Sequence, residues 1–523
     1  MKILPNTTRS FKDQLPRNLV ANLVFFLINV VIGLLLVPYF INTLGIAAYG
    51  LIPLATSITG YVAIIITSIN TSVARFLTVD LQREEYAAAN RTFNTAFFGI
   101  SAIILIMVPV IIVFSVFIPF FFQVPSGQES GVIILFLGVF TAFLIRSWSG
   151  NFTVQLFAYN RLDLQNLVNI IHVIVQTVLI ILFFTIFSPN LAFIGGAYLI
   201  GAIVASVVSI IFAKRICPFI KISVNSFDRT RVNDLCGMGW WVVINQIGAL
   251  LFLQIDLIVV NIFFGAISAG EYAIALQWMI LLRAISGVLS AILTPIVLTY
   301  YARDQIKSLI RISKSAVKLM GLAMALPIGL ICGFAPELLT VWVGPQFTSI
   351  SPLMWIMLLP LVINLAVLPL FSINVAFNRV RIPGIVLFIM GCANIVLAII
   401  LALFSGWGYY GVAIAGAITL TLTNSVFTPW YTARILKKSI MTFVSSIIIG
   451  FFAMVCIIGM TMLFSILFDI SKLQTLAISI LIISGIYLFI LIRIGLNCFE
   501  RSIAISCLPK NLQIFIKKKD SIK

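Results

Sequence analysis

Two opposite charges stand inside apolar stretches of this chain of 523 residues, where an ionised side chain is costly. Asp256 lies in the stretch 238–264 and Arg283 in the stretch 271–300, and each stretch exceeds the ~20 residues that cross a bilayer as a helix. An ionised group at bilayer depth costs ~3 kcal/mol even on the lenient insertion scale, so we expect both to face the protein interior. Counting ~1.5 Å per residue from a predicted turn at 265–272 places them ~12 Å and ~16 Å deep, close enough in level to pair.

Polar residues accompany these two charges at helical spacing. Asn245 lies three turns before Asp256 on the same helix face, and Ser286 and Ser290 follow Arg283 at i+3 and i+7. Such stripes predict a water-filled cavity in which Asn245, Asp256 and Arg283 contact the substrate. A guanidinium suits phosphate because its donors form a planar fork. The alternative is a structural salt bridge between Arg283 and Asp256.

Two further polar side chains occur within apolar stretches. Arg146 is near the middle of its stretch and either contributes to the same anion-binding cavity, snorkels, or bonds locally to Asn151. His172 shares a polar stripe with Asn169 and Gln176. It is a candidate for proton-linked coupling, together with Asp256, or else only makes hydrogen bonds between helices.

The composition indicates an all-α, polytopic membrane protein. With 62% hydrophobic and 9% charged residues, the chain is far from the quarter of charged residues typical of soluble proteins. The net charge of +18 does not indicate nucleic-acid binding, because apart from Lys472 and the two intramembrane arginines the basic residues fall in alternate connections. The positive-inside rule then places both termini in the cytosol.

No motif for cofactor or metal chemistry is found in the sequence. The seven cysteines lack zinc-like spacing, and P-loop, HExxH, GxSxG and Gly-rich dinucleotide motifs are missing. We therefore predict no cofactor, no metal, no catalytic residue and no ATP-driven transport within this chain.

Fourteen apolar stretches predict about 14 transmembrane helices. The longest inside connection is basic and lies centrally, as expected of a linker between two halves. We expect a six-helix lobe at 1–215, a cytosolic linker at 216–236, a second six-helix lobe at 237–436, two accessory helices at 437–495 and a basic cytosolic tail at 496–523.

The two lobes repeat in sequence. The segment FAYNR from Phe157 matches VAFNR from Val375, so that Asn160 corresponds to Asn378, and at the same offset Gln176 corresponds to Asn394. This predicts two bundles related by an axis along the membrane normal. The intramembrane charges break the repeat, which favours a functional role: Arg146 corresponds to Asn364, His172 to Met390 and Arg283 to about Val62.

Several segments together resemble a known family. They are VPYFINTLGIAAYGLIPLA from Val37, SINTSVARFLT from Ser68, QIDLIVVNIFFG from Gln254 with GEYAIALQ after it, the region of Pro295 and the FAYNR junction. Over about residues 15–440 the chain resembles the polysaccharide (Wzx-type, O-antigen-like) flippases of the multidrug/oligosaccharidyl-lipid/polysaccharide exporter superfamily. The last two helices resemble the accessory pair of some members.

The resemblance implies two six-helix lobes around a central, often cationic cavity that works by alternating access. It implies undecaprenyl- or dolichyl-linked oligosaccharide (pyro)phosphate as the substrate, membrane lipids and polysaccharide assembly enzymes as partners, and a monomeric chain in the cytoplasmic membrane. Asp256 matches an acidic position common in the seventh helix. Related lipid II flippases are basic in the first two helices, whereas here these spans carry Asn22 and Asn29 and no Arg before Arg75, which argues against lipid II.

Two other functions compete with a non-enzymatic flippase. A drug or small-molecule antiporter of the same fold would use Asp256 and His172 for cation coupling. A membrane glycosyltransferase or polymerase needs carboxylates on sizeable outside loops. The outside acids are instead scattered over short connections, which makes this alternative weak: Glu129, Glu271, Glu337 and Asp469.

Overall fold

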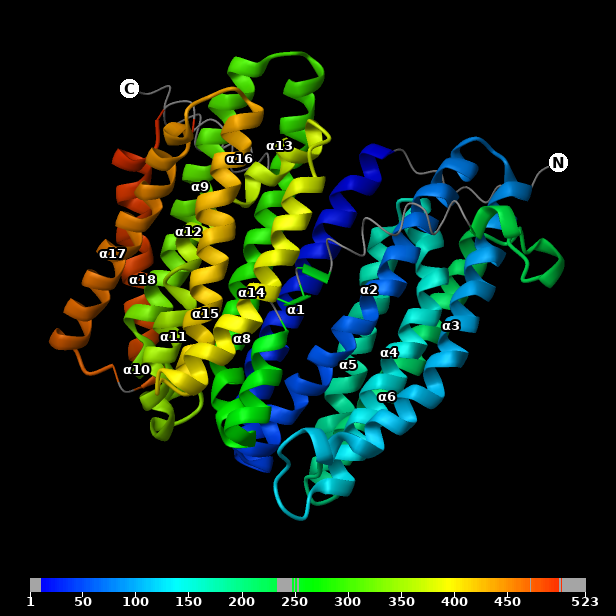
Figure 1. Cartoon of the computed structure of the whole chain (residues 1–523), viewed down its shortest axis with the longest axis horizontal. Coiled ribbons are helices and arrows are strands. Elements are labelled where there is room, and N and C mark those ends of the chain that lie inside the picture. The colour runs from blue at the N-terminus through cyan, green and yellow to red at the C-terminus, as the bar shows by residue number, and fades with distance from the viewer. Residues whose placement is uncertain are drawn as a thin grey trace. The chain divides into compact units, whose positions relative to one another are not determined.

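The computed structural model describes residues 11–232, 247–248, 250–251, 254–470, 472–497 and 500, and every regular element in these ranges is helical (Figure 1). Thirteen helical segments of the described chain are long and apolar enough to span a membrane. The predicted seventh and eighth spans form one element, α8 (Ile255–Ala302), with a kink at Gly265. The all-α, polytopic class is thereby confirmed.

The helices differ in length between the two halves of the chain. The first half contains α1 (Phe11–Leu44), α2 (Ile46–Gln82), α3 (Tyr86–Phe121), α4 (Glu129–Ala158), α5 (Leu162–Ile186) and α6 (Leu191–Ile216). After α8 come α9 (Ile306–Gly333), α10 (Ala335–Trp342), α11 (Ser351–Leu358), α12 (Leu361–Ala366), α13 (Phe371–Ala376), α14 (Arg381–Phe404), α15 (Tyr409–Thr421), α16 (Thr428–Ile435), α17 (Val444–Leu467) and α18 (Leu473–Ile490). The elements α10–α13 are short because prolines recur at their starts and between them, and proline cannot donate to a helix ladder.

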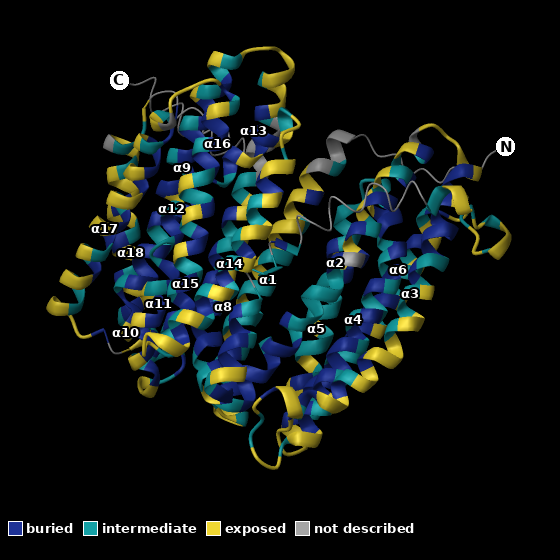
Figure 2. Ribbon diagram, in the orientation of Figure 1, coloured by how far each residue is buried: buried dark blue, intermediate teal, exposed yellow. Residues whose placement is uncertain are grey.

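Large apolar side chains point outward along many helices (Figure 2). Leu105 and Phe120 of α3, for example, are 74% and 82% exposed. In water such faces would aggregate, but hydrocarbon chains solvate them, and the helices satisfy their own backbone hydrogen bonds. The exposed apolar faces therefore fit a protein surrounded by lipid.

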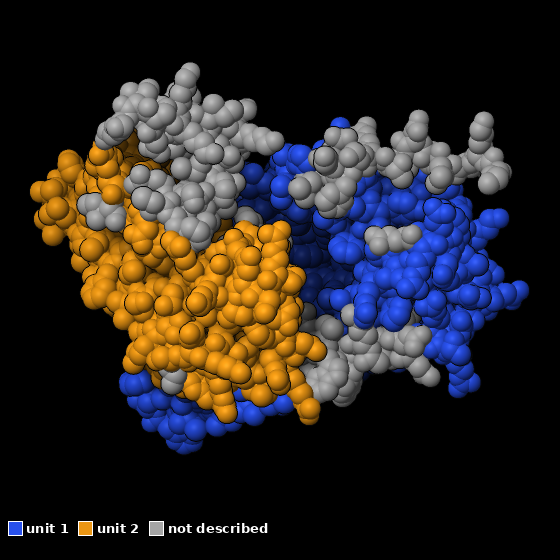
Figure 3. Space-filling model, turned by 90° about the horizontal axis from the view of Figure 1, so that it is seen from above, with its two compact units in different colours: residues 1–277, 384–412 blue, residues 278–383, 413–523 orange. Residues whose placement is uncertain are grey.

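The chain forms two compact units, which Figure 3 colours separately. Unit 1 comprises Met1–Gln277 and Gly384–Val412, and unit 2 comprises Trp278–Pro383 and Ala413–Lys523. Helix α14 thus belongs, by its packing, mainly with α1–α6 and the first part of α8.

Close glycine contacts hold the helices of unit 1 together. A Cβ atom placed on Gly195 of α6 would lie 2.9 Å from the Cα atom of Leu135 in α4, so these helices meet at backbone distance. Gly50 of α2 and Gly270 of α8 meet in the same way, since a Cβ on Gly50 would lie 2.9 Å from the Gly270 Cα atom. Small residues at such seams are how helices associate in a membrane, where burial of apolar surface gives no driving force.

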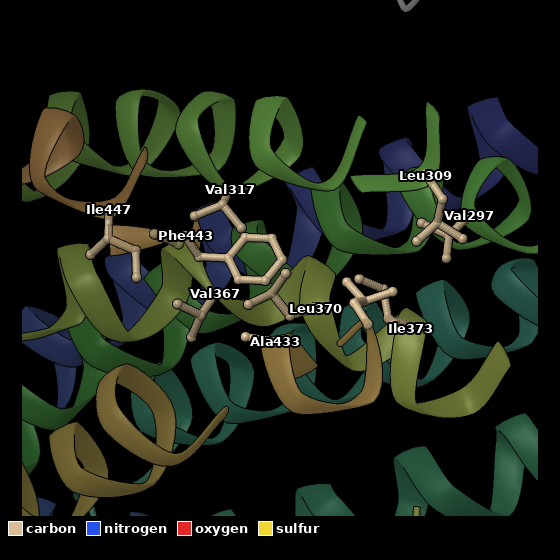
Figure 4. Packing of buried hydrophobic residues seen from close by; sticks show 11 residues of the cluster. Val297, Leu309, Val317, Val367, Leu370, Ile373, Ala433, Phe443 and Ile447 are labelled. Atoms are coloured by element: carbon tan, nitrogen blue, oxygen red, sulfur yellow. The ribbon is translucent and has the colours of Figure 1, made fainter. Parts of the chain in front are cut away.

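In unit 2, an apolar cluster joins the last turns of α8 and the first half of α9 to α13, α16 and α17 (Figure 4). Phe443 and Val317 are fully buried in it. Helix α17 also packs on α9 through Gly321 and Gly450, whose backbones touch. The Lys318 ammonium of α9 pairs with Glu500 at 2.7 Å. Helix α17, within the predicted accessory pair, and Glu500, within the predicted tail, are therefore both fixed to α9.

The repeat junctions share an unusual backbone turn. Asn160 and Asn378 both have φ of 54°, in the left-handed region where Asn is tolerated better than most residues. In both, the Asn N–H donates to the carbonyl three residues earlier, and the next N–H donates to the carbonyl five residues earlier. The sequence match between FAYNR and VAFNR thus corresponds to the same helix-ending motif.

The described part of the predicted linker lies against the start of α3. Asn94 donates to the Lys221 carbonyl at 2.8 Å and accepts from the Ser223 N–H at 2.8 Å, and Thr95 accepts from the Asp228 N–H at 3.0 Å. Burial raises the pKa of the neighbouring Cys217 thiol to about 12. This stretch is therefore part of unit 1, while residues 233–236 lie outside the described chain.

Candidate functional site

Asp256 is a buried carboxylate that accepts hydrogen bonds from two neutral side chains of unit 1. The Tyr272 hydroxyl donates to Oδ2 at 3.1 Å, and the Asn394 amide of α14 donates to Oδ1 at 3.0 Å. The kink at Gly265 explains the first contact, because Asp256 and Tyr272 lie ~13 Å and ~10 Å from it along the two arms of α8. The predicted turn 265–272 is thus too long: the chain turns at Gly265, and Tyr272 is fully buried in the following helix.

Arg283 is partly buried in the second arm of α8. Counted from Gly265, it lies ~27 Å along this arm, so the similar depth that suggested a pair with Asp256 does not follow from the observed helix. Ser286 donates to the Arg283 carbonyl at 2.8 Å, which is a bond within the helix. Arg283 belongs to unit 2 and Asp256 to unit 1, and their pairing stays a prediction.

Asn245, the fourth predicted substrate contact, lies outside the described residues. Its place on the face of Asp256 rests on the sequence alone.

Arg146 of α4 points toward α5. Its Nη2 atom donates to Asn169 Oδ1 at 2.6 Å, while its Nη1 atom is buried and has no hydrogen-bond partner within the described chain. The local bond to Asn151, one of the alternatives for Arg146, is therefore not formed. The Asn151 amide donates instead to the Trp148 carbonyl at 3.0 Å, because it lies on another face of α4.

His172 lies one turn beyond Asn169 on α5. Its Nδ1 atom is buried and, among the described residues, makes no hydrogen bond. Gly201 of α6 allows the close approach, since a Cβ there would be 3.2 Å from Nδ1. The imidazole is also near enough to Arg146 for the two to interact electrostatically. We call Arg146, Asn169 and His172 the α4–α5 cluster.

The neighbouring helix α1 fixes the start of α5. Asn166 donates to Asn22 Oδ1 at 2.6 Å, and Asn18 donates to the Asn160 carbonyl at 2.9 Å. These bonds orient the α5 face that carries Asn169 and His172. The α4–α5 cluster therefore presents a cation with an open donor in an apolar helix bundle, which is suited to binding an anion.

Comparison with known proteins decides the family. The family described as polysaccharide biosynthesis protein matches residues 15–301, more than half of the chain. The chain belongs to the polysaccharide biosynthesis protein family. A curated relative, the uncharacterized membrane protein EpsK of Bacillus subtilis (strain 168), is 34% identical over 418 residues, which are 80% of this chain and 83% of EpsK.

Solved structures resemble this family member in fold. An inward-facing multidrug resistance MATE family transporter of the MOP superfamily has a TM-score of 0.63 at 14% identity, covering 79% of this chain and 96% of its own. The lipid II flippase MurJ in an inward closed conformation has a TM-score of 0.62 at 17% identity, covering 91% and 99%. The predicted exporter-superfamily fold is confirmed.

Two partners in the site of this family member were missed by the predictions from sequence. Asn394 and Tyr272 both hold Asp256, yet neither was proposed as a site residue. A signal existed for Asn394, because it is the repeat counterpart of Gln176 and is polar within an apolar helix. Tyr272 was missed because the sequence analysis placed it in the predicted turn 265–272 rather than in a helix.

Proposed function

We propose that this family member is a non-enzymatic flippase that moves polyprenyl-(pyro)phosphate-linked oligosaccharide across the cytoplasmic membrane. The observation that carries the proposal is Arg146, a cation inside an apolar helix whose Nη1 atom is buried without a hydrogen-bond partner in the described chain. A buried donor of this kind is costly unless a ligand completes it, and phosphate oxygens are strong acceptors.

In this proposal the head group enters a polar cavity while the lipid tail stays in the bilayer, and the two lobes alternate between inward-open and outward-open states. Arg146 and Arg283 bind the phosphate groups, and Asn245 and Asp256 contact the polar head group. The inside-negative potential assists outward movement by ~2.3 kcal/mol per anionic charge per 100 mV. Polysaccharide assembly enzymes would supply and consume the substrate.

The proposal is tested in a strain lacking this chain. We expect lipid-linked oligosaccharide to accumulate on the cytosolic leaflet, and the wild-type chain to clear it. A strain without such accumulation, but with hypersensitivity to cationic drugs, would contradict a lipid-linked substrate.

A second candidate function is a cation-coupled drug or small-molecule antiporter. The observation favouring it is the Asp256 carboxylate, which is 8% exposed and bonded by the neutral groups of Tyr272 and Asn394, with the buried Tyr61 hydroxyl nearby in α2. Such a carboxylate can exchange a proton or a monovalent cation, and His172 would assist. Drug export that responds to a proton or sodium gradient and is lost in Asp256→Asn would support this function.

The proposed direction of transport requires both termini in the cytosol and Lys472 outside. We expect a cysteine at position 472, in a background without other cysteines, to react with an impermeant maleimide added to intact cells. A cysteine at position 518 should react only after lysis. The reverse labelling would overturn the orientation.

A further inference from the structure

A cavity of about 610 Å³ whose lining combines polar and apolar side chains lies within unit 1 between α2, α4 and α5. Its lining includes Arg75 of α2, Thr153 of α4 and Gln165 of α5. All three are near the helix ends on the side that the charge pattern assigns to the cytosol. The volume is in the range of ~300–1,000 Å³ that is usual for small-ligand sites.

The lining of this cavity shares helix faces with the α4–α5 cluster. On α4, Thr153 follows Arg146 at i+7, and on α5, Asn169 and His172 follow Gln165 at i+4 and i+7, so each set occupies one helix face. The bond from Arg146 to Asn169 joins the two faces. Along α4, Thr153 and Arg146 are ~10 Å apart. The cavity lining and Arg146 therefore lie along the same faces of α4 and α5, with Arg146 farther from the predicted cytosolic helix ends.

The cavity also contains an amide oxygen that a ligand could satisfy. Asn70 lines it, and its Oδ1 atom is buried with no hydrogen-bond donor in the described part of the chain. The Asn70 amide packs directly on Gly150, where a Cβ would lie 2.9 Å from Nδ2. A sugar hydroxyl is a suitable donor for such an oxygen, whereas the Arg75 guanidinium suits a phosphate.

We propose that this cavity, here named the Arg75 cavity, binds the phosphate and first sugar of the lipid-linked substrate before they reach Arg146. The inference rests on the proposed function and adds a first binding position on the predicted cytosolic side. Arg75 holds the phosphate, and Asn70 with Thr153 and Gln165 contacts the sugar.

Binding is measured separately from transport, using full-length protein in nanodiscs and undecaprenyl-diphosphate-linked N-acetylglucosamine as the probe. We expect Arg75→Ala to weaken binding at least about tenfold, because it removes a charge-assisted contact, and Arg75→Lys to recover part. Arg83→Ala is the matched control, since Arg83 is an exposed arginine that follows the same helix and does not line the cavity. It should bind like the wild type.

A second variant tests the cavity without changing charge. Thr153→Trp fills it, and the one bond that the Thr153 hydroxyl donates within the described chain is local, to the Gly150 carbonyl at 2.9 Å. We expect this variant, too, to bind at least about tenfold more weakly. If Thr153→Trp does not fold, the comparison of Arg75→Ala with Arg83→Ala still tests the inference. Arg75 is exposed, so its replacement by Ala should not disturb folding.

Equal affinities of Arg75→Ala and Arg83→Ala overturn the inference. Tighter binding of soluble UDP-N-acetylglucosamine than of the lipid-linked probe also overturns it, because the cavity would then serve a nucleotide sugar. Normal binding by Arg75→Ala in a protein that flips lipid contradicts this inference alone. Binding through Arg75 without any flipping by the wild type supports the cavity and contradicts the proposed function.

Discussion

Arg146 in unit 1 and Asn364 in unit 2 occupy equivalent positions of the sequence repeat, but their surroundings differ. Arg146 is partly buried, bonds to Asn169 and keeps a buried Nη1 atom without a partner in the described chain. Asn364 is fully buried, donates to the Thr421 hydroxyl at 3.2 Å and accepts from the Ser425 hydroxyl at 2.7 Å.

One helix position therefore has different roles in the two units. In unit 2 the polar side chain is satisfied on both sides, so it links α12 to the α15–α16 region and has no capacity for a ligand. In unit 1 the guanidinium of Arg146 has more hydrogen-bond donors than Asn169 can accept, and its Nη1 atom keeps no partner in the described chain. We therefore propose that Arg146 binds ligand and that Asn364 stabilises the packing of its helices.

The largest expected effect concerns Arg283, the other charge that breaks the repeat. If it binds phosphate, Arg283→Ala abolishes flipping while the protein still inserts, and Arg283→Lys recovers only part because Lys lacks the bidentate fork. If it instead forms a structural ion pair with Asp256, removing one partner leaves the other charge buried and unpaired, which lowers the unfolding free energy by ~3–5 kcal/mol. Removing both partners avoids this loss. Flipping assays on the double variant Arg283→Leu, Asp256→Leu separate the cases: normal transport by the double variant refutes substrate binding.

The next effect concerns Arg146. Removing its hydrogen bonds to an anion should cost about 1.5–3 kcal/mol, so Arg146→Ala should slow flipping roughly 10–100-fold. The melting temperature of this variant should change little, because the Arg146 guanidinium makes one side-chain hydrogen bond within the described chain, to Asn169. Flipping rate and melting temperature are measured on the same preparation. A variant that melts early but flips normally per folded molecule would show that Arg146 is a brace.

Asn364→Ala should give the opposite result. It leaves the half-buried Thr421 and Ser425 hydroxyls without this partner, so we expect a loss of about 1–3 kcal/mol in unfolding free energy. Flipping per folded molecule should stay near the wild-type rate. Chemical denaturation in detergent together with the flipping assay checks both parts, and a selective loss of transport contradicts the contrast between the units.

The smallest expected effect is a difference in stability between glycine variants at the two repeat junctions. Asn160 and Asn378 share the same φ, so glycine is tolerated at both, but only for Asn160 does the structure give side-chain bonds, to Asn18 and Gln14. We expect Asn160→Gly to lower the unfolding free energy by about 1 kcal/mol and Asn378→Gly to leave it nearly unchanged. Melting temperatures of the two variants provide the comparison. Equal shifts would mean that these bonds add nothing.

Much of the fold could be predicted from the sequence because membrane spans need long apolar stretches and because the repeat is visible in it. Asn160 and Asn378 were aligned by sequence and share a backbone turn. The turn at 265–272 was misplaced because one glycine with positive φ reverses the chain without a polar loop.

The side-chain partners were harder to predict. Asp256 and Asn394 are far apart in the chain and meet only through the packing of α8 with α14. Arg146 faces Asn169 rather than Asn151 because the position of α5 beside α4 decides which helix face is available. The Arg75 cavity needs three helices at once, and Arg75 alone resembles any basic residue at a helix end.

The proposed flipping of a lipid-linked oligosaccharide through an arginine-based anion site can be measured on the purified protein. The most direct test follows fluorescent undecaprenyl-diphosphate oligosaccharide in proteoliposomes and measures the fraction that becomes accessible to an impermeant quencher added outside. We predict rapid exchange between leaflets with the wild-type chain, and slow exchange both with Arg146→Ala and in vesicles without protein. Equal rates in all three preparations would contradict the account.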